Sequence, residues 1–119
     1  MNRFIISRSA EKRLFYFYEM VSMDKHVWLL RNRVGDLVLF KDGGDYPLLL
    51  PVWPSRSFAE IVGKKLAIPC EAFPMTLSAF LDDLLVEMEQ DGKAVSIFPN
   101  GHDTIIQTRE EMKAMLHDV

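Results

Sequence analysis

The sequence has only one cysteine, Cys70, so no disulfide can form within its 119 residues. Disulfides persist mainly in oxidising compartments, and a chain without them is typical of the reducing cytoplasm. Hydrophobic residues make up 49% of the chain and charged residues 26%, the balance of an ordinary globular protein. A chain of this length buries enough apolar surface to fold without a disulfide or a metal. We therefore expect a single domain over residues 1–119, with 1–8 as a loose arm or an extra strand.

Long runs of basic or of apolar residues are also missing. The formal net charge is −3, and no Lys/Arg cluster forms the basic stripe with which nucleic-acid-binding proteins usually neutralise phosphates. No stretch approaches the roughly 18 apolar residues of a membrane span. The apolar run Phe4–Ile6 is shorter than the core of a signal peptide, which takes about 7–15 residues. These absences predict a cytoplasmic protein with neither a nucleic-acid nor a membrane partner.

The residue types that carry most metal and catalytic chemistry are few and scattered. His26, His102 and His117 stand at none of the spacings typical of a metal site. Cys70 lies in an apolar segment, where a thiol is more often buried than reactive. Gly43 and Gly44 are not followed by the Lys, Ser or Thr of a phosphate-binding loop. We predict no catalytic residue, no metal and no cofactor, and a non-enzymatic protein is favoured over an enzyme.

Periodicity and turn residues divide the rest of the chain into helices and strands. Helices are predicted to begin at four caps: Ser9, Ser55 or Ser57, Thr76 and Thr108. Strands are predicted at 27–30, 37–40, 48–52, 95–98 and 104–106, with 67–73 as a weak strand at best. Strands that cluster, instead of alternating strictly with helices, indicate an α+β fold. We expect a mixed or mostly antiparallel sheet of about five to six strands, with about four helices packed mainly on one face.

Two of the helices carry specific start signals. Thr76 is followed by a continuous apolar stripe, and Met75 and Phe80 have the spacing of a hydrophobic staple. Thr108 with Glu111 three residues later is a capping box. The predicted core takes residues from every segment: Leu14, Tyr18, Val27, Leu29, Val38, Phe40, Phe58, Ile61, Leu77, Leu81, Leu84, Met88, Val95 and Ile97.

Short, Gly- and Asp-rich turns separate the first three strands. Such turns join antiparallel neighbours, so we predict a three-stranded meander. Pro47 and Pro51 lack an N–H, which places the third strand at an edge or gives it a bulge. The aromatic run Phe15–Tyr18 extends further round its helix than one buried face requires, so part of it is expected at a partner surface.

One group of residues remains as a candidate binding site: Trp53 and Arg56, with Trp28 and Asn100. A Trp beside a Pro at a strand-to-helix junction is more often plain core than site. The alternative is a recognition surface, because Trp and Arg are enriched at the energetic centres of interfaces and a helix start favours an anion. Both interpretations of Trp53 stay open at the level of sequence.

These residues also carry a family resemblance. The segment Leu50-Pro51-Val52-Trp53-Pro54, followed by Phe58-Ala59, resembles the hydrophobic-Pro-hydrophobic-Trp-Pro signature of an uncharacterised bacterial family, a domain of unknown function. The layout continues with Val27–Leu30, Leu77–Leu85 and Ser96–Pro99, and the likeness runs from about Glu11 to Leu116. The chain is more loosely similar in plan to the N-terminal domain of the SseB family. The resemblance implies the α+β fold and a bacterial cytosolic setting, and no activity.

Three classes of function are compatible with these observations. The favoured one is a non-enzymatic protein-binding or regulatory module, which docks a partner or a second copy through surplus aromatics and an edge strand. The alternative is a small-ligand binder or enzyme with a pocket near Trp53 and Arg56. A third is an immunity-type protein, whose acidity would suit the basic site of a toxin.

Overall fold

The computed structural model describes residues 3–41 and 44–117. Its helices are η1 (Arg3–Ser7, 3₁₀), α1 (Ala10–Asp24), α2 (Arg56–Gly63), α3 (Leu77–Ala79), the π turn η2 (Phe80–Leu84), α4 (Leu85–Gln90) and α5 (Arg109–His117). Its strands are β1 (His26–Asn32), β2 (Phe40–Lys41), β3 (Leu48–Val52), β4 (Cys70–Thr76), β5 (Ala94–Ile97) and β6 (Ile105–Gln107). The fold is α+β, as predicted, and the elements follow in the expected order.

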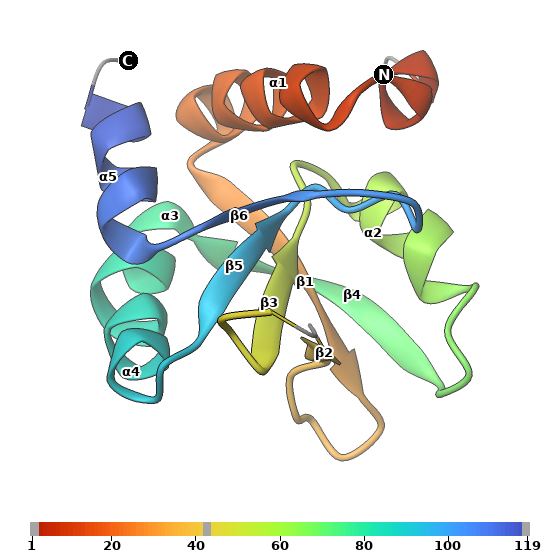
Figure 1. Ribbon diagram of the computed structural model, residues 1–119. Coiled ribbons are helices and arrows are strands. Elements are labelled where there is room, and N and C mark those ends of the chain that lie inside the picture. Colours follow the sequence, from red (N-terminus) through yellow and green to blue (C-terminus); the bar gives the residue numbers. More distant parts are fainter. Residues whose placement is uncertain (1–2, 42–43, 118–119) are drawn as a thin grey trace.

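The six strands divide between two sheets (Figure 1). β1 pairs antiparallel with β4, and the other sheet has the order β2-β3-β5-β6. Only β3 and β5 run parallel in that sheet, so the pairing is mostly antiparallel, as expected. The sheets meet where the backbones of Trp28 and Trp53 exchange two hydrogen bonds of 2.9 Å.

The predicted three-stranded meander forms only in part: β2 and β3 pair antiparallel, but β1 belongs to the other sheet. After β1 the chain turns at Asn32, whose Oδ1 accepts hydrogen bonds from the N–H groups of Val34 and Asp36. The returning segment touches β1 only briefly, through the Val38 N–H to the Leu30 carbonyl, before it diverges to β2. β1 instead takes β4 as its long partner, over seven register pairs from His26–Thr76 to Asn32–Cys70.

β3 lies in the interior of its sheet, and the expectation that its prolines place it at an edge is also wrong. The N–H of Trp53 points toward β1, so that of Pro51, two residues earlier, would point the same way. On that side β2 pairs only with Leu48 and Leu49. Pro51 therefore falls in a gap between two neighbours, where its missing N–H removes no ladder hydrogen bond.

The boundaries of β4, which also contains a proline, differ from those predicted. The stretch 67–73 was predicted to be weakly extended, whereas β4 is a regular strand from Cys70 to Thr76 that includes Pro74. At the other end of the chain, Arg3–Ser7 forms a 3₁₀ turn, neither a loose arm nor a strand, and buries Ile5. The first two residues of that predicted arm lie outside the described residues.

Three of the four predicted helix caps form side-chain capping bonds, whereas Ser55 stands at the N-cap of α2 without one. Ser9 accepts a hydrogen bond from the Lys12 N–H and opens α1, and Thr76 does the same for Ala79 and opens α3. The capping box forms in both directions: the Glu111 N–H donates to Thr108 and the Thr108 N–H to the Glu111 carboxylate. On α1 the aromatic run divides, since Phe17 is buried and Phe15 is 55% exposed.

The long helix predicted after Thr76 is interrupted by the π turn η2. There the Leu85 N–H bonds the Phe80 carbonyl, five residues back, which frees the neighbouring carbonyl of Leu81. Nε of Arg109, at the start of α5, donates to this Leu81 carbonyl at 2.8 Å. The interruption is thus stabilised from outside the helix.

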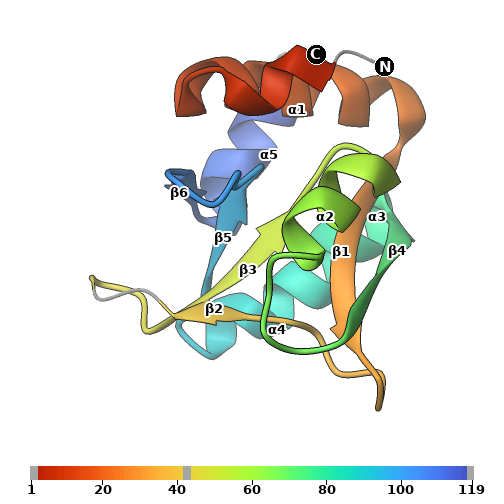
Figure 2. The same cartoon turned by 90° about the vertical axis from the view of Figure 1, so that its right-hand side faces the viewer.

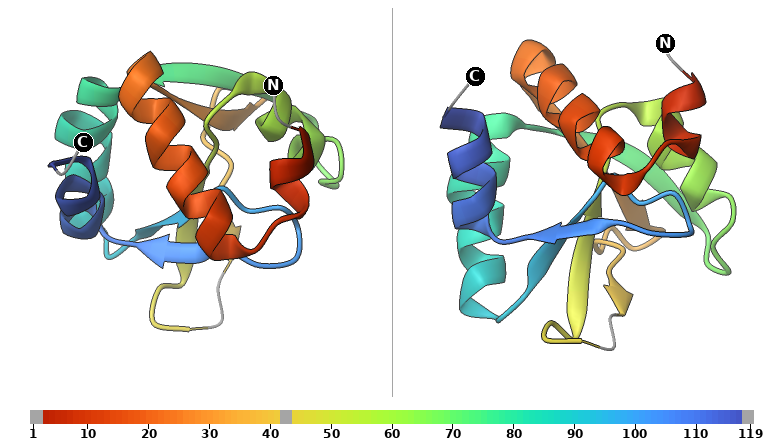
Figure 3. Two further views of the ribbon diagram at one scale, coloured as in Figure 1. Left: turned by 90° about the horizontal axis from the view of Figure 1, so that it is seen from above. Right: turned by 45° about the horizontal axis from the view of Figure 1, so that its top comes forward.

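The helices surround the two sheets (Figures 1–3). Figure 1 shows α1 across the top, α2 on the right, and α3, α4 and α5 stacked on the left. Figure 2 shows α2 against the β1–β4 pair, and the views in Figure 3 show α1 crossing over the sheet end. Nine of the predicted core residues are buried: Leu14, Tyr18, Val27, Leu29, Val38, Phe58, Met88, Val95 and Ile97. The other five are partly buried against the core: Phe40, Ile61, Leu77, Leu81 and Leu84.

Candidate functional site

Trp53, the first of the predicted site residues, belongs to the core. Its exposed fraction is 0%, and its Nε1–H donates to the carbonyl of Pro99 at 2.9 Å. Phe40 packs against its ring edge-to-face with centroids 6.5 Å apart. A side chain so enclosed and so fully hydrogen-bonded cannot contact a ligand in this conformation, so the packing interpretation of Trp53 is confirmed.

Asn100, the second, organises the loop between β5 and β6. Its Oδ1 accepts from the N–H groups of His102 and Asp103, and its Nδ2 donates to the carbonyl of Ile6 at 2.9 Å. All of these bonds are to backbone atoms, so Asn100 joins the loop to η1.

Arg13 completes this region, and the sequence analysis missed it. Its guanidinium is fully buried and donates four hydrogen bonds: to the carbonyls of Phe98, Arg8 and Asp103, and to the Asp103 carboxylate at 2.7 Å. Phe98 has φ +48°, an unusual conformation for a bulky residue, and the bond from Arg13 to its carbonyl helps to hold it. One signal was available: Arg13 stands four residues before Phe17, within the buried stripe of its helix.

Trp28 and Arg56 lie together elsewhere. The guanidinium carbon of Arg56, on the first turn of α2, lies 4.6 Å from the ring centroid of half-buried Trp28 on β1. This cation–π contact holds a long, exposed side chain flat against the sheet. Of the four predicted residues, these two are the ones that reach an accessible surface as a pair.

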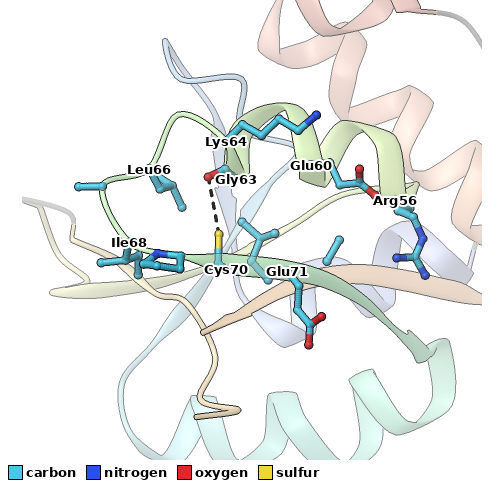
Figure 4. A pocket seen from close by; sticks show the side chains of 12 residues that line it. Arg56, Glu60, Gly63, Lys64, Leu66, Ile68, Cys70 and Glu71 are labelled. Atoms are coloured by element: carbon cyan, nitrogen blue, oxygen red, sulfur yellow. Dashed lines mark hydrogen bonds between the residues drawn. The ribbon is translucent and has the colours of Figure 1, made fainter. Parts of the chain in front are cut away.

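Arg56 borders a surface groove (Figure 4). This groove, of about 480 Å³, lies between α2, the connection 64–69 and β4. Its apolar lining includes Leu30, Leu66, Ile68 and Ala72, and charged side chains of α2 and β4 stand at its rim. A volume of this size accommodates one or two side chains of a partner. We call it the α2–β4 groove.

Gly63 allows α2 to lie close to the sheet beside this groove. It is the last residue of α2, and its φ is not positive. A Cβ there would lie 3.3 Å from Leu30 Cδ2 and 3.4 Å from the Sγ of Cys70, tighter than ordinary contact. The Cys70 thiol donates to the Gly63 carbonyl at 3.6 Å, and burial raises the pKa of this thiol. A protonated, hydrogen-bonded thiol is a poor nucleophile.

The outer edge of β4 is unpaired. Trp28 directs both its backbone groups toward Trp53, so Trp28 and its register partner Pro74 exchange no hydrogen bonds. Pro74, and by alternation Ala72 and Cys70, therefore point their backbone groups away from β1. No strand among residues 3–41 and 44–117 pairs with β4 on that side. Pro74 is tolerated because its missing N–H would face outward.

A second cavity continues the groove past the start of β4. It measures about 290 Å³ and is lined by Arg31, Asn32, Arg33, Pro69, Cys70 and Glu71, the last three of which also line the α2–β4 groove. Arg31 pairs with Glu71 at 2.8 Å and lies over the Phe73 ring. Arg33, Arg56 and Lys64 form no ion pair within the described part of the chain.

Among the described residues, no three His, Cys, Asp or Glu side chains gather as a metal site would require. No helix there has both the length and the apolarity needed to cross a bilayer.

Comparison with known proteins places the chain in a family. The model of the family described as "Protein of unknown function (DUF2750)" matches residues 14–116, so the chain belongs to that family. This confirms the predicted membership of a domain-of-unknown-function family; the likeness to SseB stays a prediction. No curated protein matches the chain.

Proposed function

For this member of its family we propose a non-enzymatic peptide-binding module, which takes an extended segment of a partner protein into the α2–β4 groove. The observation that carries the proposal is the coincidence of an apolar groove with an unpaired strand edge. An extended peptide beside β4 would form main-chain hydrogen bonds with Cys70 and Ala72 and place alternate side chains in the groove. The single free thiol and the family resemblance support a bacterial cytoplasm as its place of action.

The orientation of the strand supports this mode of binding. Cys70 and Ala72 lie on the face of the β1–β4 pair that α2 covers, because the Gly63 position approaches both Leu30 and Cys70. A peptide residue in register with Ala72 would point its side chain to the same face, and so into the groove. Backbone donors and an apolar pocket thus lie at one register position.

The alternative is a small-molecule site in the same cavity. Its volume is within the range of ligand pockets, and Arg56 and Lys64 supply polar groups. The unpaired edge favours the peptide, because a small molecule would leave the outward backbone groups of β4 unused. Trp53 is buried and the Asn100 side chain is bonded to backbone atoms, so neither residue would contact the ligand in the groove.

Selection from a display library of random peptides tests the proposal. We expect enriched sequences with an apolar residue that fits the groove, and binding that is lost in the variant Ala67→Trp, which fills the groove from its exposed rim. Ala114→Trp, the same change at an exposed position on α5, is the matched control and should bind normally.

A chemical variant of the peptide separates strand addition from other modes. Methylation of those peptide amides that face β4 should abolish binding, whereas methylation of the intervening amides should not, since only alternate amides face a neighbouring strand. If methylation of either set of peptide amides leaves binding unchanged, or if the Ala67→Trp variant still binds the enriched peptides, the proposed site is excluded.

A further inference from the structure

We infer that the groove selects acidic partners, namely an extended segment in which an apolar residue stands between two carboxylates at alternate positions, Glu-x-Leu-x-Glu or its equivalent. This inference rests on the proposed function and adds the chemistry of the partner. It is carried by the placement of the unpaired cations along β4.

The charge of the groove differs from that of the whole chain. The protein has a formal net charge of −3, yet the two connected cavities are lined by four cationic side chains, Arg31, Arg33, Arg56 and Lys64, against the carboxylates of Glu60 and Glu71. An ion pair joins Arg31 to Glu71, and the other three cations form no ion pair with any residue in 3–41 or 44–117. An anionic partner would supply the missing counter-charges.

The cations stand near both ends of the outer edge of β4, with which no described strand pairs. Arg56 lies over Trp28, whose register partner is Pro74, and Arg33 follows Asn32, whose register partner is Cys70. Pro74 and Cys70 are four residues apart, which is about 13 Å along a strand. Figure 4 shows Arg56 at one end of the groove and Ile68 at the other, with Lys64, the residue after α2, above.

The positions of these cations along β4 predict the sequence pattern of the bound peptide. Peptide residues in register with Pro74, Ala72 and Cys70 would all point to the face that α2 covers, because side chains of one face recur every second residue. The middle one meets the apolar lining at Ala72 and Leu30. One of the outer two comes beside Arg56, which lies over Trp28, and the other comes beside the second cavity, which Arg33 lines; Lys64 also borders the groove.

Arg56 is prepared for this contact. Its stacking on Trp28 fixes a side chain that would otherwise lose much rotamer freedom on binding. The guanidinium edges remain available, since no hydrogen bond or ion pair of the Arg56 side chain occurs in the described structure. A guanidinium held in this way can donate two parallel hydrogen bonds to one carboxylate.

The test compares fluorescently labelled peptides that contain Glu-Ser-Leu-Ser-Glu, the neutral Gln-Ser-Leu-Ser-Gln, and the shifted Glu-Leu-Ser-Ser-Glu. We expect the first to bind about tenfold more tightly than the second, as a few partly exposed ion pairs allow, and with a stronger dependence on salt. The shifted peptide should bind more weakly than the first, because its Leu faces away from the groove.

Charge reversal of the protein supplies the second arm. Arg56→Glu and Arg33→Glu, both at exposed positions, should each lower the affinity for the Glu-Ser-Leu-Ser-Glu peptide. A peptide in which one Glu is changed to Lys should bind either variant more tightly than the original peptide does. Lys113→Glu on α5 makes the same change of net charge away from the groove and should have no effect beyond general screening. If the Glu and Gln peptides bind equally, the acidic preference is wrong and the peptide-binding function stands; if neither binds, both are wrong.

Discussion

The four residues that the sequence suggested as one candidate site lie in two different regions of the structure. Trp53 and Asn100 lie near the buried Arg13, whereas Trp28 and Arg56 lie together at the α2–β4 groove. The polar side-chain groups of Arg13, Trp53 and Asn100 are all hydrogen-bonded within the fold. The Arg13 guanidinium donates four hydrogen bonds, the Trp53 indole donates one, and the Asn100 amide donates one and accepts two. In the α2–β4 groove Arg56 and Lys64 form no ion pair with any described residue, and alternate backbone groups of β4 point to an edge with which no described strand pairs. A buried polar group that is fully satisfied indicates a structural role, whereas accessible, unpaired groups indicate a place for a partner.

The largest effect is expected from Arg13→Ala. The substitution leaves the carbonyls of Arg8, Phe98 and Asp103 without their donor inside the fold, which should lower the free energy of unfolding by about 3–4 kcal/mol. Urea unfolding measures it, and Lys12→Ala, one residue away and exposed, is the control with little change. A loss as small as that of the control would mean that the region is not held by Arg13.

The two tryptophans give the next comparison. Trp53→Phe removes the donor to the Pro99 carbonyl and leaves a cavity in the core, at a cost of about 2 kcal/mol in the free energy of unfolding. Trp28→Phe, at a half-buried position beside the groove, should cost less than half as much. Thermal unfolding of both variants side by side would contradict the account if Trp28→Phe proved the more damaging.

Arg56→Ala should barely change stability and should change binding. The cation–π contact with Trp28 is worth about 0.5 kcal/mol at an exposed site, so the unfolding midpoint should move little. Affinity for an acidic peptide should fall severalfold, as measured by fluorescence polarisation. A large decrease in the free energy of unfolding would mean that Arg56, like Arg13, mainly stabilises the fold, and would contradict this prediction.

The smallest effect concerns Cys70. Because burial raises the pKa of its thiol, less thiolate is present at pH 8 than in an ordinary cysteine, and alkylation by iodoacetamide should be slower than in the urea-unfolded chain. As the pH rises past the usual thiol range the unfolded chain ionises first, so the folded state loses a little stability there. Alkylation at the rate of the unfolded chain would place Cys70 outside the packed wall of the groove.

Local sequence signals predicted most of the elements but only part of their pairing. Caps at Ser9, Thr76 and Thr108 act through contacts three residues away, which a sequence displays directly. The partner of β1 depends on a strand about 40 residues further along, and no local signal selects it. Proline shows the same limit: Pro51 and Pro74 both avoid ladder hydrogen bonds, but only Pro74 does so at a sheet edge.

The candidate site was predicted in part. Trp28 and Arg56 were selected as residue types, and the structure places them together at the groove. Trp53 and Asn100 were selected for the same reasons and proved to be bonded into the fold, because residue type does not reveal whether a polar group is already satisfied. The groove itself could not be predicted, since it arises from the packing of α2 on β4 at Gly63.

Hydrogen exchange of the Ala72 amide tests the central claim most directly. In the free protein this outward N–H should exchange much faster than the amides of Glu71 and Phe73, which face β1, and an added groove-binding peptide should slow it. Amides around Trp53 and Asn100 should be unaffected. An Ala72 amide as slow as its neighbours in the free protein, or protection by peptide only near Trp53 and Asn100, would contradict the assignment of the α2–β4 groove as the binding site.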